Sequence, residues 1–96
     1  MKYAYAAVFT PEENGAFSVR FPDLPGCYTS GDDMPDAVTM AQDVLCLWLY
    51  DMEQAKKPIP PASNPSDIKA KSKEVTSIVA VNTETYRRFE KLHTTQ

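Results

Sequence analysis

Alternating apolar and polar positions near the start of the chain predict short β-strands. Residues 2–9 are rich in aromatic, alanine and valine side chains that alternate between the two sides of an extended chain. Residues 16–21 alternate in the same way, and the Glu-Asn-Gly sequence at 13–15 is typical of a tight turn between antiparallel strands. The pattern therefore predicts a hairpin, followed by a short third strand over residues 27–30.

The segment before the third expected strand contains two prolines and a glycine, in the order Pro22-Asp23-Leu24-Pro25-Gly26. Proline fixes its own φ angle, whereas glycine lacks a Cβ and adopts positive φ at little steric cost. Pro25 and Gly26 are therefore expected to be the two central residues of a type II turn.

A long amphipathic helix is predicted over residues 34–56. Asp33 is placed to accept hydrogen bonds from the first free backbone N–H groups, Asp36 completes a weak capping box, and Pro35 is tolerated in the first turn. Asp43, Asp51 and Glu53 are expected to face water. The apolar residues follow the three-and-four spacing of a single buried stripe, and they are Ala37, Val38, Ala41, Val44, Leu45, Trp48, Leu49, Met52 and Ala55.

Four prolines between residues 56 and 73 predict an extended connection, and residues 75–81 have the β-branched character of a last strand. A short helix over residues 83–92 is expected to follow. The fold class is therefore α+β with the order β-β-β-α-β. A right-handed crossover is expected to lay the fourth strand parallel to the first, which gives a mixed sheet with the long helix on one face. Because the other face has no covering layer, we expect a homodimer or a higher oligomer.

The composition limits the class of protein. Ninety-six residues suit one domain. The chain has no apolar run long enough to span a bilayer and no signal-peptide pattern at its start, so a cytoplasmic location is expected. Cys27 and Cys46 lack metal-ligand or redox spacing and are interpreted as structural thiols, and His93 has no acid partner near it in the sequence. The net charge of −3 argues against phosphate-driven nucleic-acid binding and suits a basic partner.

Residues 16–33, together with the continuation into the helix through residue 37, closely resemble the signature of HicB-like antitoxins. The resemblance extends over residues 5–10, the Lys57-Pro58-Ile59-Pro60 segment and the final strand. It implies a truncated RNase H-like fold without the catalytic acids of the nuclease, and a HicA-like partner, which is a small basic mRNA-cleaving toxin. The residues that define the signature are Pro22, Pro25, Gly26, Cys27 and Gly31.

The expected domain covers residues 1–82, and residues 83–96 are expected to form a short helical tail. Many HicB-like chains carry a ribbon-helix-helix or helix-turn-helix after the final strand. No complete DNA-binding domain is recognised here, so specific DNA binding by this chain alone is not expected. The function implied is neutralisation of the toxin by protein–protein contact. The alternative is a stand-alone homo-oligomeric module with no toxin partner.

Acidic residues on the turns of the first half are the candidate toxin interface, because they suit a basic toxin surface. A metal-binding cluster is the alternative reading, but turn formation and helix capping explain Asp23 and Asp33 better. We expect no metal, no cofactor and no catalysis. The lysines around the proline-rich connection are interpreted as a solvated linker rather than a nucleic-acid site. The candidate interface residues are Glu12, Glu13, Asp23, Asp32, Asp33 and Asp36.

Overall fold

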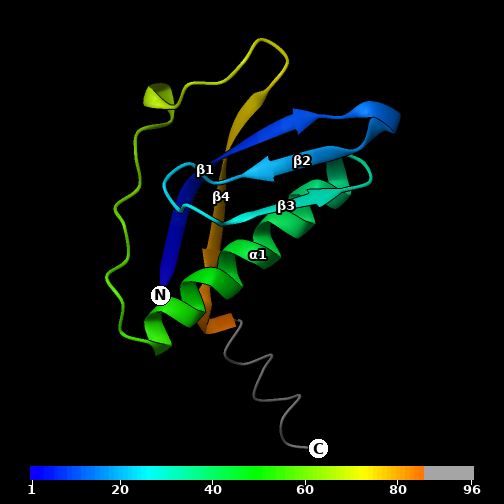
Figure 1. Ribbon diagram of the computed structural model, residues 1–96. Coiled ribbons are helices and arrows are strands. Elements are labelled where there is room, and N and C mark those ends of the chain that lie inside the picture. The colour runs from blue at the N-terminus through cyan, green and yellow to red at the C-terminus, as the bar shows by residue number, and fades with distance from the viewer. Residues whose placement is uncertain (86–96) are drawn as a thin grey trace, which may run out of the picture.

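The computed structural model describes residues 1–85, which form a four-stranded sheet with one long helix across one face (Figure 1). The predicted order of three strands, helix and strand is confirmed. Beyond residue 85, the rest of the expected C-terminal helix lies outside the described residues. The elements are β1 (Lys2–Pro11), β2 (Phe17–Arg20), β3 (Tyr28–Gly31), α1 (Met34–Gln54) and β4 (Val75–Asn82), with 3-10 turns at Glu13–Gly15 and Pro65–Asp67.

The strands lie in the order β3-β2-β1-β4, and every neighbouring pair is antiparallel. The α+β class is confirmed, but the expectation of a fourth strand parallel to the first was wrong. In the observed register Phe9 pairs with Val75 and Lys2 pairs with Asn82, so β4 runs against β1 along almost its whole length. The sheet is therefore fully antiparallel rather than mixed.

The path of residues 55–74 explains this orientation. Helix α1 ends beside the start of β1, where the hydroxyl of Tyr3 donates a hydrogen bond to Glu53 Oε2 at 2.7 Å. A parallel β4 would have to begin at that end. Instead the proline-rich connection runs back along the domain, and the hydroxyl of Tyr5 donates to the carbonyl oxygen of Pro60 on the way. The connection ends beside the last residues of β1, so β4 begins next to the end of β1 and runs back toward its start.

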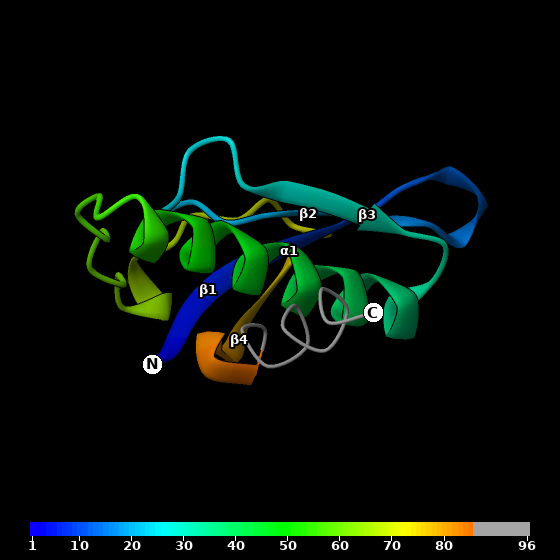
Figure 2. The ribbon, with the colours of Figure 1, turned by 90° about the horizontal axis from the view of Figure 1, so that it is seen from below.

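The core fills the space between the sheet and α1, which lies lengthwise along one face of the sheet in Figure 2. Odd-numbered residues of β1 point toward the helix, and the helix contributes most of its predicted stripe. The prediction was wrong for Val38 and Ala55, which are exposed because they lie off the part of α1 that packs against the sheet. The largest of the fully buried apolar side chains are Phe21, Leu24, Leu45 and Leu49.

The opposite face of the sheet is only partly open. Ala6 and Val8, in the middle of β1, are buried, whereas Ile78 on β4 is 48 % exposed and Tyr28 on β3 is 70 % exposed. The apolar surface expected on this face is thus concentrated toward its two edges.

Among residues 1–85, no helix has the length and apolar character needed to cross a bilayer.

Candidate functional site

The loop between β2 and β3 consists of two consecutive turns. The Leu24 N–H donates to the Phe21 carbonyl at 3.0 Å, and the Cys27 N–H donates to the Leu24 carbonyl at 2.9 Å. Each turn has a proline at its second position, and Gly26, at the third position of the second turn, has a φ of 91°. The type II turn predicted at Pro25-Gly26 is therefore confirmed.

Two signature glycines let α1 approach the sheet closely. A Cβ on Gly26 would lie 3.2 Å from the ring of Trp48 in the helix. A Cβ on Gly31 would lie 2.3 Å from the backbone nitrogen of Ala37, a distance that only displacement of the helix relieves. The signature thus fixes where the helix begins and how it lies on the sheet.

Three aspartates organise the start of α1. Asp33 is the N-cap, and its Oδ1 accepts from the Asp36 N–H at 2.9 Å, as predicted. In a capping box the Asp36 carboxylate would accept from the Asp33 N–H. Here Asp36 Oδ2 accepts from the Asp32 N–H instead. All three residues are exposed to solvent. They are held by capping geometry, and they add negative charge at the positive end of the helix dipole.

The structure brings five of the six candidate residues to one end of the domain. Glu12 and Glu13 lie at the turn between β1 and β2, at the same end as the turn from β3 into α1 (Figures 1 and 2). Lys2 and Arg20 are the only basic residues before Lys56 in the sequence. We call Glu12, Glu13, Asp32, Asp33 and Asp36 the acidic end.

Asp23, the sixth candidate, does not join this group. It lies in the loop between β2 and β3, toward the opposite end of the sheet, and holds the proline-rich connection. Its two carboxylate oxygens accept from the backbone N–H of Ser63 at 2.7 Å and from the Ser63 hydroxyl at 2.6 Å. Its role in the fold is therefore to fasten the connection, and it lies apart from the acidic end.

The sequence analysis missed a surface that continues from the acidic end along α1. Met40 and Leu47 are 38 % and 40 % exposed, although they lie on a long helix with a well-formed buried face. They alternate with exposed aspartates at three-and-four spacing, which places all of them along one side of the helix. The sequence did contain a signal for this surface, because Met40 and Leu47 are apolar but lie outside the predicted buried stripe. This helix stripe consists of Asp36, Met40, Asp43, Leu47 and Asp51.

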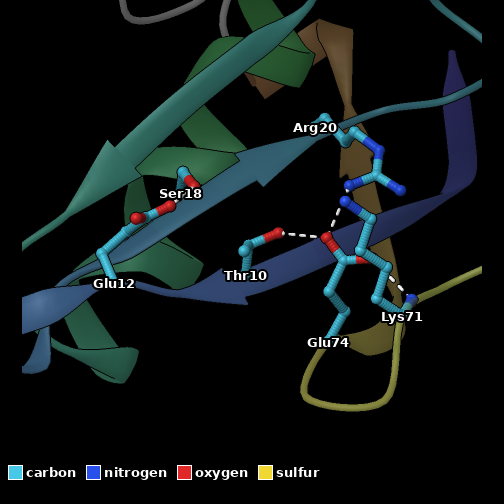
Figure 3. A network of polar contacts seen from close by, with 6 residues as sticks. All are labelled: Thr10, Glu12, Ser18, Arg20, Lys71 and Glu74. Atoms are coloured by element: carbon cyan, nitrogen blue, oxygen red, sulfur yellow. Dashed lines mark hydrogen bonds and ion pairs between the residues drawn. The ribbon is translucent and has the colours of Figure 1, made fainter.

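A cluster of polar contacts around Glu74 was also not predicted. Glu74 Oε2 accepts from the Thr10 hydroxyl at 2.6 Å and from Arg20 at 2.9 Å, and its Oε1 accepts from the Lys71 N–H at 2.8 Å (Figure 3). The Glu74 side chain is only 6 % exposed. The hydrogen bond from Arg20 is the largest cause that lowers the pKa of Glu74 to about 2, with the Lys71 and Thr10 bonds adding to it. This cluster anchors the start of β4 to β1 and β2.

Glu53 was expected to face water, but it is half-buried and ties the other end of the sheet to the helix. Its Oε2 accepts from the hydroxyls of Tyr3 at 2.7 Å and of Thr83 at 3.0 Å. Burial, together with the hydrogen bond and negative charge of Glu53, raises the pKa of Tyr3 to about 12. Burial alone raises the pKa of the Cys27 thiol to about 11, which leaves it protonated and unreactive at neutral pH. Tyr3 and Thr83 thus hold Glu53, and the Cys27 thiol is part of the buried core.

Within residues 1–85, no three histidine, cysteine or acidic side chains are grouped so that they would hold a metal ion. The Asp33 and Asp36 carboxylates accept the capping hydrogen bonds of α1, and Glu53 and Glu74 accept from hydroxyl and guanidinium groups. What the exposed surface offers is negative charge at one end of the domain, continued by an acidic and apolar helix face. Such a surface is suited to binding a basic partner.

Comparison with known proteins gives a consistent result. A model of the HicB-like antitoxins of bacterial toxin-antitoxin systems matches residues 5–92. The chain is 36% identical over 58 residues to Antitoxin HicB 1 of Photorhabdus laumondii, a match that covers 58% of this chain and 37% of that protein. It is 27% identical over 56 residues to the UPF0150 protein Ta0767 of Thermoplasma acidophilum, covering 58% of this chain and 81% of that protein.

Solved structures share the fold. A chain from a toxin-antitoxin complex of Streptococcus pneumoniae superposes with a TM-score of 0.79 at 20% identity, covering 90% of this chain and 73% of that chain. The N-terminal domain of the Burkholderia pseudomallei antitoxin HicB gives a TM-score of 0.73 at 17% identity, and a chain of the HicA3 and HicB3 complex gives 0.67 at 21%. Each of these two matches covers 83% of this chain and 99% of the other chain.

Proposed function

The chain belongs to the family of HicB-like antitoxins of bacterial toxin-antitoxin systems, and we propose that it neutralises a HicA-like, mRNA-cleaving toxin by direct contact. The contact surface in this proposal is the acidic end together with the helix stripe. The domain acts by binding, without catalysis of its own, and it meets its toxin in the cytoplasm.

The observation that carries the proposal is the placement of charge. Five acidic residues from two separate turns meet at one end of the domain, and two more acidic residues of α1, Asp43 and Asp51, face outward along the same helix. A ribonuclease that binds RNA needs a positive surface, because it must contact phosphates. A negative protein surface that competes for that site blocks RNA by electrostatic complementarity.

The apolar members of the helix stripe add the second component of a stable interface. Met40 and Leu47 are each more than one-third exposed, and they lie between aspartates. Burial of such side chains against a partner contributes affinity, whereas the surrounding charges contribute orientation and association rate. The proposal therefore predicts that apolar and acidic positions of the stripe both affect toxin binding.

The test is co-expression with the HicA-like protein encoded beside this chain in its genome. The toxin alone is expected to arrest growth, and the pair is expected to grow and to co-purify. The Asp32→Lys and Asp43→Lys double variant reverses charge at two exposed carboxylates while leaving the Asp33 cap intact. We expect it to weaken toxin binding about tenfold or more.

Asp67→Lys is the control for a single charge reversal away from the assigned surface, at an exposed residue of the connection, and it is compared with Asp32→Lys and Asp43→Lys taken singly. It is expected to bind the toxin like the wild type. Equal loss in Asp67→Lys and in the two single variants would remove the assigned surface. Absence of any HicA-like neighbour, or failure of the folded wild-type chain to restore growth, would favour the stand-alone oligomeric module instead.

A further inference from the structure

A hollow of about 350 Å³ lies at the C-terminal end of α1. This volume is at the lower end of the range for sites that enclose a small ligand, so it suits a single side chain of a partner. The hollow adjoins the helix stripe, because Asp51 belongs to both. The residues that line it are Trp48, Asp51, Met52, Ala55 and Lys57.

The Trp48 ring is held in place before any partner binds. The side chain is half-buried and packs against the core, and the loop between β2 and β3 closes over one edge of the ring. A Cβ on Gly26 would lie 3.2 Å from Cη2 and 3.7 Å from Cζ2 of Trp48, so the loop comes this close because Gly26 has no side chain. An aromatic surface fixed in this way loses little conformational entropy on binding.

Three features of the hollow attract a cation. The face of an indole ring carries negative charge density, and Trp48 supplies such a ring. Asp51 adds an exposed carboxylate. The C-terminal end of α1 adds the negative end of the helix dipole, and the last turn of this helix contains no basic residue. The chain already places one exposed cation at the hollow, which is Lys57.

We propose that the hollow receives one arginine side chain of the toxin, an inference that rests on the proposed function and names the chemistry of its anchor. The guanidinium stacks on Trp48 and pairs with the Asp51 carboxylate, while its methylene stem contacts Met52 and Ala55. Lys57 turns out to solvent as the arginine enters. Arginine is favoured over lysine because its planar group stacks on a ring and donates two parallel hydrogen bonds to a carboxylate.

Fluorine NMR tests whether Trp48 is at the contact. The chain contains one tryptophan, so a fluorinated tryptophan incorporated into the full antitoxin chain reports on this site alone. Its resonance is expected to move when the unlabelled HicA-like protein encoded beside this chain is added. An unchanged resonance in a complex that forms would overturn the anchor and leave neutralisation standing. Absence of any complex would remove both the proposed function and the anchor.

Three substitutions in the antitoxin test the charge of the hollow. Asp51→Asn is expected to weaken toxin binding about tenfold. Asp43→Asn is the matched control, because it makes the same replacement at an exposed residue of the helix stripe outside the hollow, and it is expected to weaken binding about twofold. Lys57→Gln is expected to tighten binding about threefold, because it removes the cation that the arginine must displace. A purely structural role of the hollow would not produce this opposite sign.

A double-mutant cycle identifies the arginine. Each arginine of the toxin is replaced by lysine in turn, which keeps the charge but removes the planar group. For one of them, the loss of affinity is expected to shrink at least threefold when the antitoxin carries Asp51→Asn, and to persist in full with Asp43→Asn. Equal losses in Asp51→Asn and Asp43→Asn, weaker binding by Lys57→Gln, or no arginine coupled to Asp51 would overturn the proposal.

Discussion

Replacement of Gly31 by alanine is the sharpest test of how the signature positions the helix. The added Cβ would lie 2.3 Å from the backbone nitrogen and 2.5 Å from the Cα of Ala37, and 2.8 Å from the carbonyl carbon of Asp36. All three atoms belong to the backbone of the first helical turn, so no side chain can rotate away. The start of α1 must move by roughly an ångström, which is the kind of overpacking that costs about 1 to 3 kcal/mol.

For a domain of this size, 1 kcal/mol lowers the melting temperature by about 4 to 8 °C, so Gly31→Ala should melt roughly 5 to 20 °C below the wild type. Ser30→Ala is the control, because this neighbouring residue is exposed on the same strand and meets no such contact. Exchange of the Asp36 amide should also accelerate as its bond to Asp33 is disturbed. A variant that melts within about 2 °C of the wild type would refute the close approach of strand and helix.

Three further predictions follow from single residues. Gly26→Val should destabilise the domain by about 1 to 3 kcal/mol in thermal melting, because the residue has positive φ and faces Trp48; an unchanged midpoint would contradict the turn. The ionised Glu74 carboxylate stabilises the fold above its ordinary pKa of 4.5, and this contribution is lost as the pH falls toward about 2. Between these pH values the stability of Glu74→Gln should therefore fall less steeply than that of the wild type. Parallel stability curves for the two proteins would contradict this. Cys27, buried and with a raised pKa, should react with a thiol reagent at pH 8 only after unfolding, and rapid labelling of the native protein at this residue would contradict its burial.

Local rules were sufficient for much of the fold. The turn at Pro25-Gly26 and the cap at Asp33 depend on residues within a few positions of each other, and both were predicted correctly. The orientation of β4 depends on contacts between residues far apart in sequence. Glu74 meets Thr10 and Arg20 at one end of the sheet, and no periodicity in the sequence encodes such a meeting. The crossover rule gives a parallel strand only when the chain enters that strand beside the start of β1. The proline-rich segment instead carries the chain to the end of β1, where Val75 pairs with Phe9.

The candidate site was predictable to a similar extent. Acidic residues on turns were recognised as a set, but a sequence does not show which turns share an end of the domain. Asp23 was grouped with the others, whereas the structure uses it to hold Ser63. The helix stripe was missed because Met40 and Leu47 were not considered apart from the buried face, although their spacing relative to Ala37 and Ala41 already placed them outside it.

The most direct test of the account is inhibition of RNA cleavage by the purified toxin. A HicA-like protein encoded beside this chain, mixed with a single-stranded RNA substrate, is titrated with the full antitoxin chain at physiological salt. Cleavage is expected to fall in proportion to added antitoxin and to stop near equimolar amounts, with the Asp32→Lys and Asp43→Lys double variant requiring a large excess. Undiminished cleavage in the presence of excess folded antitoxin would contradict the central claim that this domain neutralises its toxin by direct contact.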